Sequence, residues 1–210
     1  MALFITFEGG EGSGKSVQSR ALYEKLAQSS IPVVLTHEPG STPLGDEISR
    51  WLKWANADIA PMTELLLFNA SRAHLVDGVI KPNLENGKIV ICDRYADSTI
   101  AYQYSGRGVD LEIVKKINNA ATQGLTPDLT ILLDMPSAEG LGHKKARKRD
   151  RFERENIAFH QKVRQGYLKL AADEPERWLV IDATQSKERI ADIIWQRVRR
   201  LIAERDLKDE

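Results

Sequence analysis

The sequence predicts an α/β fold: one parallel sheet of five strands with helices packed on both of its faces. Three observations carry this prediction. Five short apolar runs, most of them rich in β-branched residues, alternate with segments of helical periodicity. A glycine-rich loop joins the first apolar run to the first helical segment. No internal repeat or linker interrupts the 210 residues, so we expect a single domain over residues 1–210.

The five predicted strands are short and mostly apolar, as expected for strands that are buried on both faces of a sheet. They are Leu3–Phe7, Pro32–Thr36, Ile89–Cys92, Leu129–Leu133 and Trp178–Ile181. Ligands of such sheets bind at the carboxyl ends of the strands. Polar groups follow every one of these strands, namely Glu8, Glu38, Asp93, Asp134 and Asp182. We therefore expect these groups to converge on one cleft.

Helices are predicted where apolar residues recur with helical spacing between the strands. The ranges are Ser16–Ala27, Asp46–Ala55, Pro61–Val79, Ser98–Tyr104, Leu111–Ala121, Phe152–Ala172 and Lys187–Ala203. Asp110 is expected to cap the helix that follows it, and Pro61 suits a first helical turn. Pro82 is expected to end or kink the helix before it.

The glycine-rich loop has the spacing of a P-loop, the phosphate-binding loop of a large class of NTPases. Gly9 and Gly14 enclose four residues and are followed by Lys15 and Ser16. Glycines let backbone N–H groups turn inward around phosphate oxygens, and the helix that follows presents its positive end to the same anion. Lys15 is expected to reach the β- and γ-phosphates and Ser16 to bind Mg²⁺. The loop residues expected to bind the nucleotide are Gly9, Gly10, Glu11, Gly12, Ser13, Gly14, Lys15 and Ser16.

The overall composition argues against several classes of binding partner and site. The 30 basic and 30 acidic residues balance, so we expect no nucleic-acid partner. The single cysteine, Cys92, excludes an intramolecular disulfide bond and a multi-cysteine metal site. No apolar stretch approaches membrane-spanning length, and no signal-like segment precedes the first predicted strand. We therefore expect a cytoplasmic protein without a membrane partner.

Asp93, Arg94 and Tyr95 lie at the end of the third predicted strand. Asp93 is a candidate to hold Mg²⁺ through water, and Arg94 is a candidate clamp for the phosphate of a second substrate. A helix-capping aspartate with an arginine partner is the alternative. Arg50 and Arg72 lie on helices that we expect to face the same cleft, and several arginines away from the phosphate loop indicate a phosphate-bearing acceptor.

A basic segment, Gly140–Arg151, differs in composition from the rest of the chain. It follows a predicted strand and carries arginines that can swing over a phosphate chain. We therefore interpret residues from about 137 to 153 as a basic lid. A solvated surface segment is the alternative, and a nucleic-acid patch is disfavoured by the neutral charge of the whole chain.

Three classes of P-loop protein need to be separated. A GTP-dependent switch is expected to carry an Asn-Lys-x-Asp motif, which this sequence lacks. A switch-type or partitioning ATPase stays open as an alternative. A small-molecule kinase needs cationic groups opposite the γ-phosphate and a mobile cover, and this sequence has candidates for both.

With these residues the sequence resembles the thymidylate kinase family, which consists of P-loop nucleoside monophosphate kinases. The shared motifs run along the chain in the family's order: Phe7–Ser16, Glu38–Gly40, Phe68–His74, Asp93–Tyr95, Ser98–Thr99, Ala101–Gln103 and Asp150–Glu153. The resemblance implies transfer of the γ-phosphate of ATP to dTMP with Mg²⁺, in a homodimer. Trp51 and Trp54 are candidates for the dimer interface.

The resemblance also implies a role for each matching residue. In the base pocket, Phe68 stacks on the thymine ring, Arg72 contacts the base, and Thr99 and Gln103 complete the pocket. Tyr102 lies under the deoxyribose and disfavours a 2′-hydroxyl group.

On the phosphate side, the resemblance assigns the dTMP phosphate to Arg50 and Arg94 and includes Glu38 among the substrate contacts. Glu11 is expected to face the 3′-hydroxyl of the acceptor, because a carboxylate directed at phosphate would be costly.

The phosphate loop contains no arginine, so the chain resembles the bacterial members that carry this arginine in the lid. Arg147, Arg149 and Arg151 are the candidates to contact the transferring phosphoryl group, and Arg147 or Arg151 is favoured. The catalytic set is therefore Lys15, Asp93, Arg94, Arg147 and Arg151. The second pKa of a phosphate monoester is near 6, so dTMP is largely dianionic at neutral pH and needs no general base.

Overall fold

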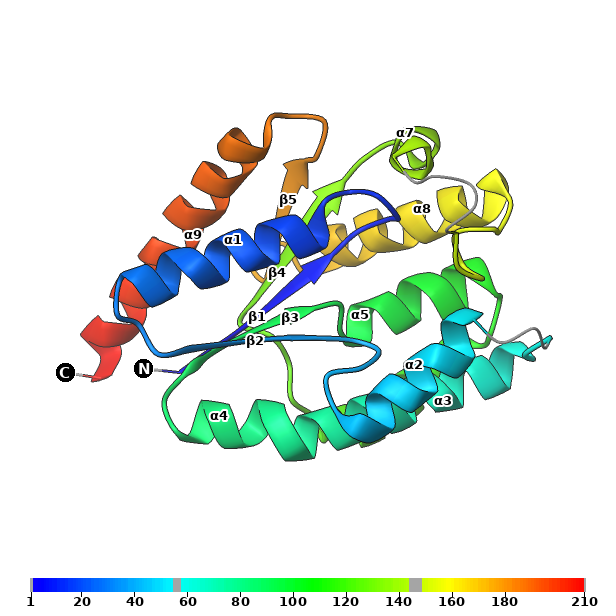
Figure 1. Cartoon of the computed structure of the whole chain (residues 1–210), viewed down its shortest axis with the longest axis horizontal. Helices are drawn as coiled ribbons and strands as arrows, with labels where there is room; N and C mark the ends of the chain where they lie inside the picture. Colours follow the sequence, from blue (N-terminus) through cyan, green and yellow to red (C-terminus); the bar gives the residue numbers. More distant parts are fainter. Residues whose placement is uncertain (1, 55–57, 144–148, 210) are drawn as a thin grey trace.

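The computed structural model describes residues 2–54, 58–143 and 149–209. At its centre is one parallel sheet with the strand order β2-β3-β1-β4-β5 (Figure 1). The strands are β1 (Leu3–Glu8), β2 (Val33–His37), β3 (Ile89–Asp93), β4 (Leu129–Asp134) and β5 (Trp178–Asp182). The predicted five-stranded parallel sheet is confirmed, and every predicted strand lies within a residue or so of its observed bounds.

Side chains of β1 alternate between the two faces of the sheet, because successive residues of a strand point to opposite sides. Leu3, Ile5 and Phe7 pack in one core cluster with Leu22 of α1 and Ile194 of α9. Helices α1 (Lys15–Gln28) and α9 (Lys187–Asp209) therefore cover one face, at the top of Figure 1.

The opposite face of the sheet is covered by a second group of helices. Phe4 of β1 belongs to a second cluster with Leu75 and Val76. The helices on this side are α2 (Pro43–Trp54), α3 (Pro61–Leu75), α4 (Lys81–Glu85), α5 (Ala96–Thr99), α6 (Leu111–Thr122) and α8 (Ile157–Asp173). A short helix, α7 (Ser137–Gly142), follows β4 near the phosphate loop. Among the described residues, no helix combines the length and the apolar character needed to cross a membrane.

The helix does not end before Pro82, which was one of the two outcomes expected for this proline. After α3, the chain passes through a π-helical turn, η1 (Val76–Ile80), and continues as α4 to Glu85. The N–H of Lys81 donates to the carbonyl of Val76, five residues earlier, so the hydrogen-bond register shifts before the proline. Pro82 then occupies the first turn of α4, where its missing N–H is tolerated.

Three other predicted helices begin two or more residues away from the expected start. The helix expected at Asp46 begins at Pro43 as α2. The helix expected at Ser98 begins at Ala96 as α5 and continues as a π-helical segment, η2 (Ile100–Gly106). The helix expected at Phe152 begins at Ile157, because the Asn156 side chain accepts a hydrogen bond from the N–H of Phe159 and caps it there. The predicted Asp110 cap of α6 is present, at 3.0 Å from the N–H of Ile113.

Candidate active site

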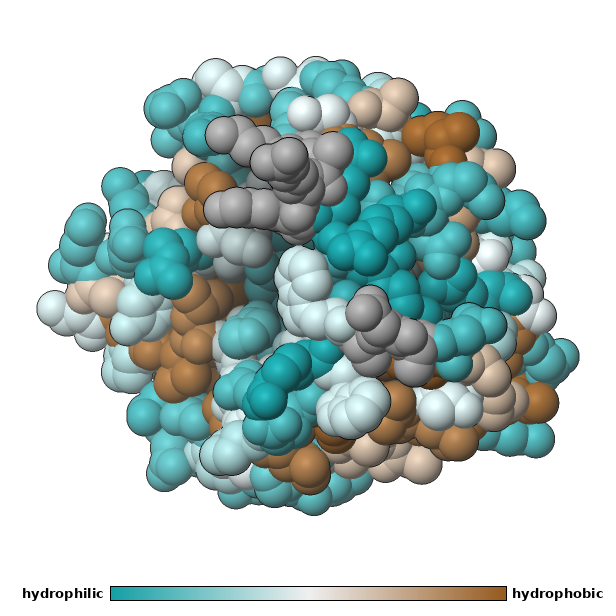
Figure 2. Space-filling model, turned by 45° about the vertical axis from the view of Figure 1, so that its right-hand side comes forward, coloured by the Kyte–Doolittle hydropathy of each residue, from teal (hydrophilic) through white to brown (hydrophobic). Residues whose placement is uncertain are grey.

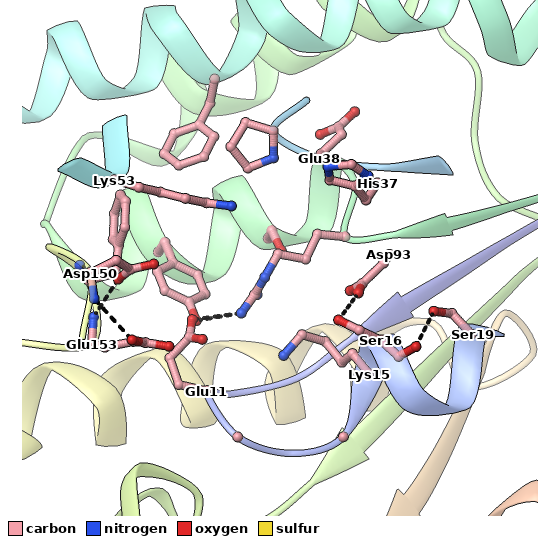
Figure 3. A pocket seen from close by; sticks show the side chains of 18 of the residues that line it. Glu11, Lys15, Ser16, Ser19, His37, Glu38, Lys53, Asp93, Asp150 and Glu153 are labelled. Atoms are coloured by element: carbon pink, nitrogen blue, oxygen red, sulfur yellow. Dashed lines mark hydrogen bonds and ion pairs between the residues drawn. The ribbon is translucent and has the colours of Figure 1, made fainter. Parts of the chain in front are cut away.

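A cavity of about 690 Å³ lies at the carboxyl ends of β1, β2 and β3. Its walls include Lys15 and Ser16 of the phosphate loop, Glu38 after β2, and Asp93 and Arg94 at the end of β3 (Figure 3). Figure 2 turns this side of the molecule forward and shows a hollow with hydrophilic residues gathered along one border. The structure therefore brings Glu38 and Asp93, two of the polar groups predicted to follow the strands, into one cavity with the phosphate loop.

The polar groups after β4 and β5 have other partners. Asp134 accepts two hydrogen bonds of 2.7 Å from the guanidinium group of Arg164. Asp182 caps the following turn by accepting from the N–H and hydroxyl groups of Thr184. The expectation that all five strand ends contribute to this cavity is wrong for these two aspartates, because an ion pair and a local turn occupy them.

The phosphate loop adopts the backbone conformations for which glycine is needed. Gly12 and Gly14 have φ angles of 72° and 91°, in the left-handed region. A Cβ atom on Gly12 would lie 2.0 Å from the carbonyl oxygen of Gly140, so the loop and α7 are in direct backbone contact. His143, at the end of α7, reaches the Gly12 carbonyl with its Nδ1 atom at 3.1 Å.

Lys15 lies across the phosphate loop, with its Nζ atom 2.7 Å from the carbonyl oxygen of Gly10. The side chain is buried, and burial, with the nearby cation Arg94, lowers its pKa to about 8. An anion bound in the loop would favour the charged form again.

Ser16 and Asp93 form an oxygen pair at the start of α1. The Ser16 hydroxyl group donates to Asp93 Oδ2 at 2.5 Å. Both residues line the cavity, and hydroxyl and carboxylate oxygens are the ligands that Mg²⁺ prefers. The residues present therefore fit the predicted metal.

Arg94 is the centre of a buried polar cluster. One guanidinium nitrogen donates to Glu11 Oε1 at 2.7 Å and to the Tyr102 hydroxyl group at 3.1 Å. Tyr102 in turn donates to Glu11 at 2.6 Å. Although burial alone would lower it, the pKa of Arg94 is raised well above its ordinary value by Tyr102 and Glu11. The cluster holds a permanent cation between β3 and the phosphate loop.

Glu8 was expected to join the other strand-end groups in one cleft, but it lies behind this cluster and does not line the cavity. It is completely buried and accepts hydrogen bonds from the N–H of Tyr95 and from the hydroxyl groups of Ser98 and Tyr167, at 2.6–2.8 Å. Burial, with repulsion from Asp97, raises its pKa to about 7. The only sequence signal for Glu8 is its place directly before the phosphate loop.

Three of the four residues assigned to the thymine base, Phe68, Thr99 and Gln103, line the same cavity as the phosphate loop. Tyr102, assigned to the deoxyribose, lines it too. Phe68 comes from α3, and the others come from α5 and η2, so two helical segments build this wall. The Phe68 ring lies 5.6 Å from that of Phe152, which belongs to the turn before α8.

Arg72 is placed behind the cavity wall, with only 1% of its surface exposed. Its guanidinium group donates to Glu38 and Thr99, both at 2.8 Å, and to the carbonyl oxygen of Tyr95 at 3.1 Å. Asn118 accepts a further hydrogen bond of 2.8 Å. The donors of Arg72 are therefore directed at protein oxygens, and its contact with a base stays a prediction.

Lys53, which the sequence interpretation missed, lines the cavity, whereas Arg50 lies on the surface of α2. The Arg50 side chain is 64% exposed and pairs with Glu47. Lys53 points into the cavity from the side opposite Lys15 (Figure 3). Burial, and also the neighbouring Arg94, lowers the pKa of Lys53. Both Arg50 and Lys53 lie off the apolar stripe of α2, so the sequence pattern does not distinguish which of the two cations points inward.

Of the two favoured lid arginines, the structure describes only Arg151. Arg147 lies outside the described residues. Arg151 pairs with Glu64 of α3 at 2.6 Å and donates to the carbonyl oxygen of Leu52 at 2.9 Å. Asp150 and Glu153, from the same segment, line the cavity. The end of the predicted lid is thus anchored to α2 and α3, and the contact of either arginine with a phosphoryl group stays a prediction.

Comparison with known proteins identifies the family. A family model described as thymidylate kinase matches residues 7–194. The chain is 57% identical over 199 residues to the thymidylate kinase of Dehalococcoides mccartyi, covering 94% of this chain and 96% of that protein. It is 49% identical over 208 residues to the thymidylate kinase of a Roseiflexus species, covering 92% of each.

A solved structure gives the same result. The crystal structure of thymidylate kinase from Ehrlichia chaffeensis matches with a TM-score of 0.73 and 36% sequence identity, covering 86% of this chain and 92% of that chain. These matches extend over most of the molecule and over most of the residues that line the cavity, so the chain belongs to the thymidylate kinase family.

Proposed function

We propose that this chain transfers the γ-phosphoryl group of ATP to dTMP, giving dTDP and ADP for dTTP synthesis. One observation carries the proposal: the phosphate loop and the set Phe68, Thr99, Tyr102 and Gln103 line one cavity. A nucleoside monophosphate held by this set has its phosphate directed toward Arg94 and the phosphate loop. We expect the protein to act in the cytoplasm, without a nucleic-acid or membrane partner.

On the donor side, the phosphate loop binds ATP through its backbone N–H groups and the positive end of α1. Lys15 leaves the Gly10 carbonyl and pairs with the β- and γ-phosphates. Ser16 and Asp93 would hold Mg²⁺, which neutralises charge on the phosphate oxygens when it is bound.

On the acceptor side, we assign the dTMP phosphate to Arg94 and Lys53. Both side chains line the cavity, and Arg94 is held in place by Glu11 and Tyr102. The resemblance assigns this role to Arg50, but that side chain is largely exposed and paired with Glu47. Glu11, positioned by Tyr102, is directed at the 3′-hydroxyl of the deoxyribose.

The chemistry needs in-line positioning and charge neutralisation, because the acceptor phosphate is already a dianion near neutral pH. Lys15 and Arg94 supply fixed positive charge on either side of the transferring group. We assign the lid arginine to Arg147 or Arg151, which neutralises the phosphoryl group and helps to exclude water when the lid closes.

We also propose that the chain is a homodimer. The side that carries α2 and α3 has large apolar residues that face solvent in the single chain: Trp51 is 63% exposed, Trp54 54% and Leu66 50%. Large apolar residues exposed together on neighbouring helices are typical of a surface that is covered in an assembly.

The proposed activity is tested by measuring ADP release from Mg-ATP with dTMP, dUMP, UMP, CMP, AMP or GMP, or without acceptor. We expect the fastest turnover with dTMP. Some activity with dUMP is expected, because a single methyl group contributes only about 1–3 kcal/mol of discrimination. ADP release that is independent of any acceptor would instead support an ATPase. Preference for another monophosphate would contradict the base pocket assigned here.

A further inference from the structure

Glu64 is a completely buried carboxylate that lies behind the proposed base pocket and has no role in the mechanism above. It comes from α3, between the apolar residues Met62 and Leu65. Its Oε1 atom accepts a hydrogen bond of 2.7 Å from the carboxamide nitrogen of Gln103. Gln103 lines the cavity, so Glu64 is in direct contact with a residue of its wall.

Two arginines keep Glu64 in an environment that suits a carboxylate. Arg107 lies 3.2 Å from one carboxylate oxygen and Arg151 lies 2.6 Å from the other. A carboxylate accepts hydrogen bonds and cannot donate them. The NH₂ group of Gln103 must therefore face Glu64, and its carbonyl oxygen is the group left for the cavity. That oxygen makes no hydrogen bond with any residue that the structure describes.

Arg72 has the complementary effect on Thr99. Its guanidinium group donates to the Thr99 hydroxyl oxygen at 2.8 Å, and a guanidinium group cannot accept. The hydroxyl proton of Thr99 is therefore available as a donor, and Thr99 lines the cavity beside Gln103. One buried anion and one buried cation thus determine which wall residue accepts and which donates.

We propose that Glu64 is a positioning residue: by fixing the orientation of Gln103, it selects the pyrimidine by its hydrogen-bonding pattern. The inference rests on the proposed function, because it assumes that Gln103 and Thr99 contact the base. Thymine and uracil present a donor at N3 and an acceptor at O4, which match the Gln103 carbonyl oxygen and the Thr99 hydroxyl group. Cytosine presents an acceptor at N3 and a donor at its amino group, so both contacts would be mismatched.

The test compares dTMP with 5-methyl-dCMP, which differ only at these two positions of the ring. Glu64→Gln gives Gln103 a partner that can either donate or accept, so its carboxamide is free to turn. We expect the ratio of kcat/KM for dTMP to that for 5-methyl-dCMP to fall about tenfold or more, because one buried contact is no longer mismatched for cytosine.

A control variant separates this effect from a general disturbance of the ion pairs. Glu155→Gln removes the other carboxylate bound by Arg107, at 2.6 Å, without touching Gln103. This variant should retain the wild-type ratio, even where the absolute rates fall.

A reciprocal exchange tests the orientation directly. The double variant Glu64→Gln/Gln103→Glu exchanges the two side chains. The carboxylate at position 103 can only accept hydrogen bonds, so it presents an acceptor oxygen to the base as well as to the residue at position 64. The preference for dTMP should return. If Glu64→Gln fails to fold, as judged by circular dichroism, the exchange and Thr99→Val replace it. Thr99→Val removes the donor and should lower the rate with dTMP more than that with 5-methyl-dCMP.

The outcomes distinguish a failure of the proposed kinase function from a failure of the role inferred for Glu64. A wild-type protein that phosphorylates dTMP, combined with an unchanged ratio in Glu64→Gln, overturns this inference alone. An equal loss of selectivity in Glu155→Gln also overturns it, because the loss would then come from disturbed ion pairs and not from the orientation of Gln103. A wild-type protein that phosphorylates no pyrimidine monophosphate overturns the proposed function and the inference together.

Discussion

Glu8 links stability to pH at the scale of a single residue. Burial raises its pKa to about 7 in the folded protein, whereas its ordinary value is 4.5. Between these two values the unfolded chain has lost the proton that the folded chain retains. Folding therefore binds a proton in this window, and the stability contributed by Glu8 decreases as the pH rises from 4.5 to about 7 and is level above it.

Glutamine resembles the protonated carboxyl group but does not titrate. We therefore expect Glu8→Gln to abolish the fall of roughly 3 kcal/mol in the free energy of unfolding that Glu8 causes between these two pH values. Urea unfolding of the wild type and the variant at about pH 5 and about pH 7.5 provides the measurement. The variant should gain stability relative to the wild type at the higher pH. Parallel pH dependences of the two proteins would show that Glu8 does not titrate in this range.

Lys53 and Arg50 form a matched pair for testing the phosphate contact. The two side chains lie one helical turn apart on α2, but only Lys53 lines the cavity. We expect Lys53→Ala to raise KM for dTMP by about tenfold or more, because a charge-assisted hydrogen bond is lost. Arg50→Ala should leave KM for dTMP close to the wild-type value. Steady-state kinetics at saturating ATP measures both, and the reverse order of effects would restore the role that the resemblance gives to Arg50.

At the scale of secondary-structure elements, the contact between α7 and the phosphate loop depends on glycine. A Cβ atom on Gly140 would lie 2.2 Å from the carbonyl oxygen of Glu11, so the loop or the helix would have to move. Gly142 is a matched control in the same helix, because a Cβ atom there meets nothing within 4 Å.

We expect Gly140→Ala to destabilise the protein by about 1–3 kcal/mol and to raise KM for ATP, since overpacking displaces the residues that bind phosphate. Gly142→Ala should change neither quantity. Thermal unfolding and KM for ATP are the measurements. Equal behaviour of the two variants would mean that α7 does not support the phosphate loop.

At the scale of the whole molecule, the exposed tryptophans of α2 predict an assembly. We expect the wild type to sediment as a dimer and Trp51→Glu/Trp54→Glu to sediment as a monomer, because two buried aromatic side chains are replaced by charges. Leu207→Glu is the control, since Leu207 is 74% exposed on α9, which covers the other face of the sheet. A monomeric wild type would contradict the proposed homodimer.

The sequence by itself determined the order of the strands and helices and the position of the phosphate loop. These features are local: strands follow from apolar runs of a few residues, and the loop follows from the spacing of Gly9, Gly14 and Lys15. The parallel sheet followed because alternating strands and helices have few ways to pack. Local spacing could not reveal the π-helical turn before Pro82, which depends on the hydrogen-bond register of the preceding helix.

Only the tertiary structure decided which side chains reach the cavity and how they are oriented. Arg50 and Lys53 are equivalent in the sequence, and packing of α2 on its neighbours turns one outward and the other inward. The orientation of Gln103 depends on Glu64, 39 residues away, because a carboxamide presents whichever end its buried partner leaves free. A side chain's partners are set by segments that are distant in the chain, so its role in a site is settled when those segments pack together.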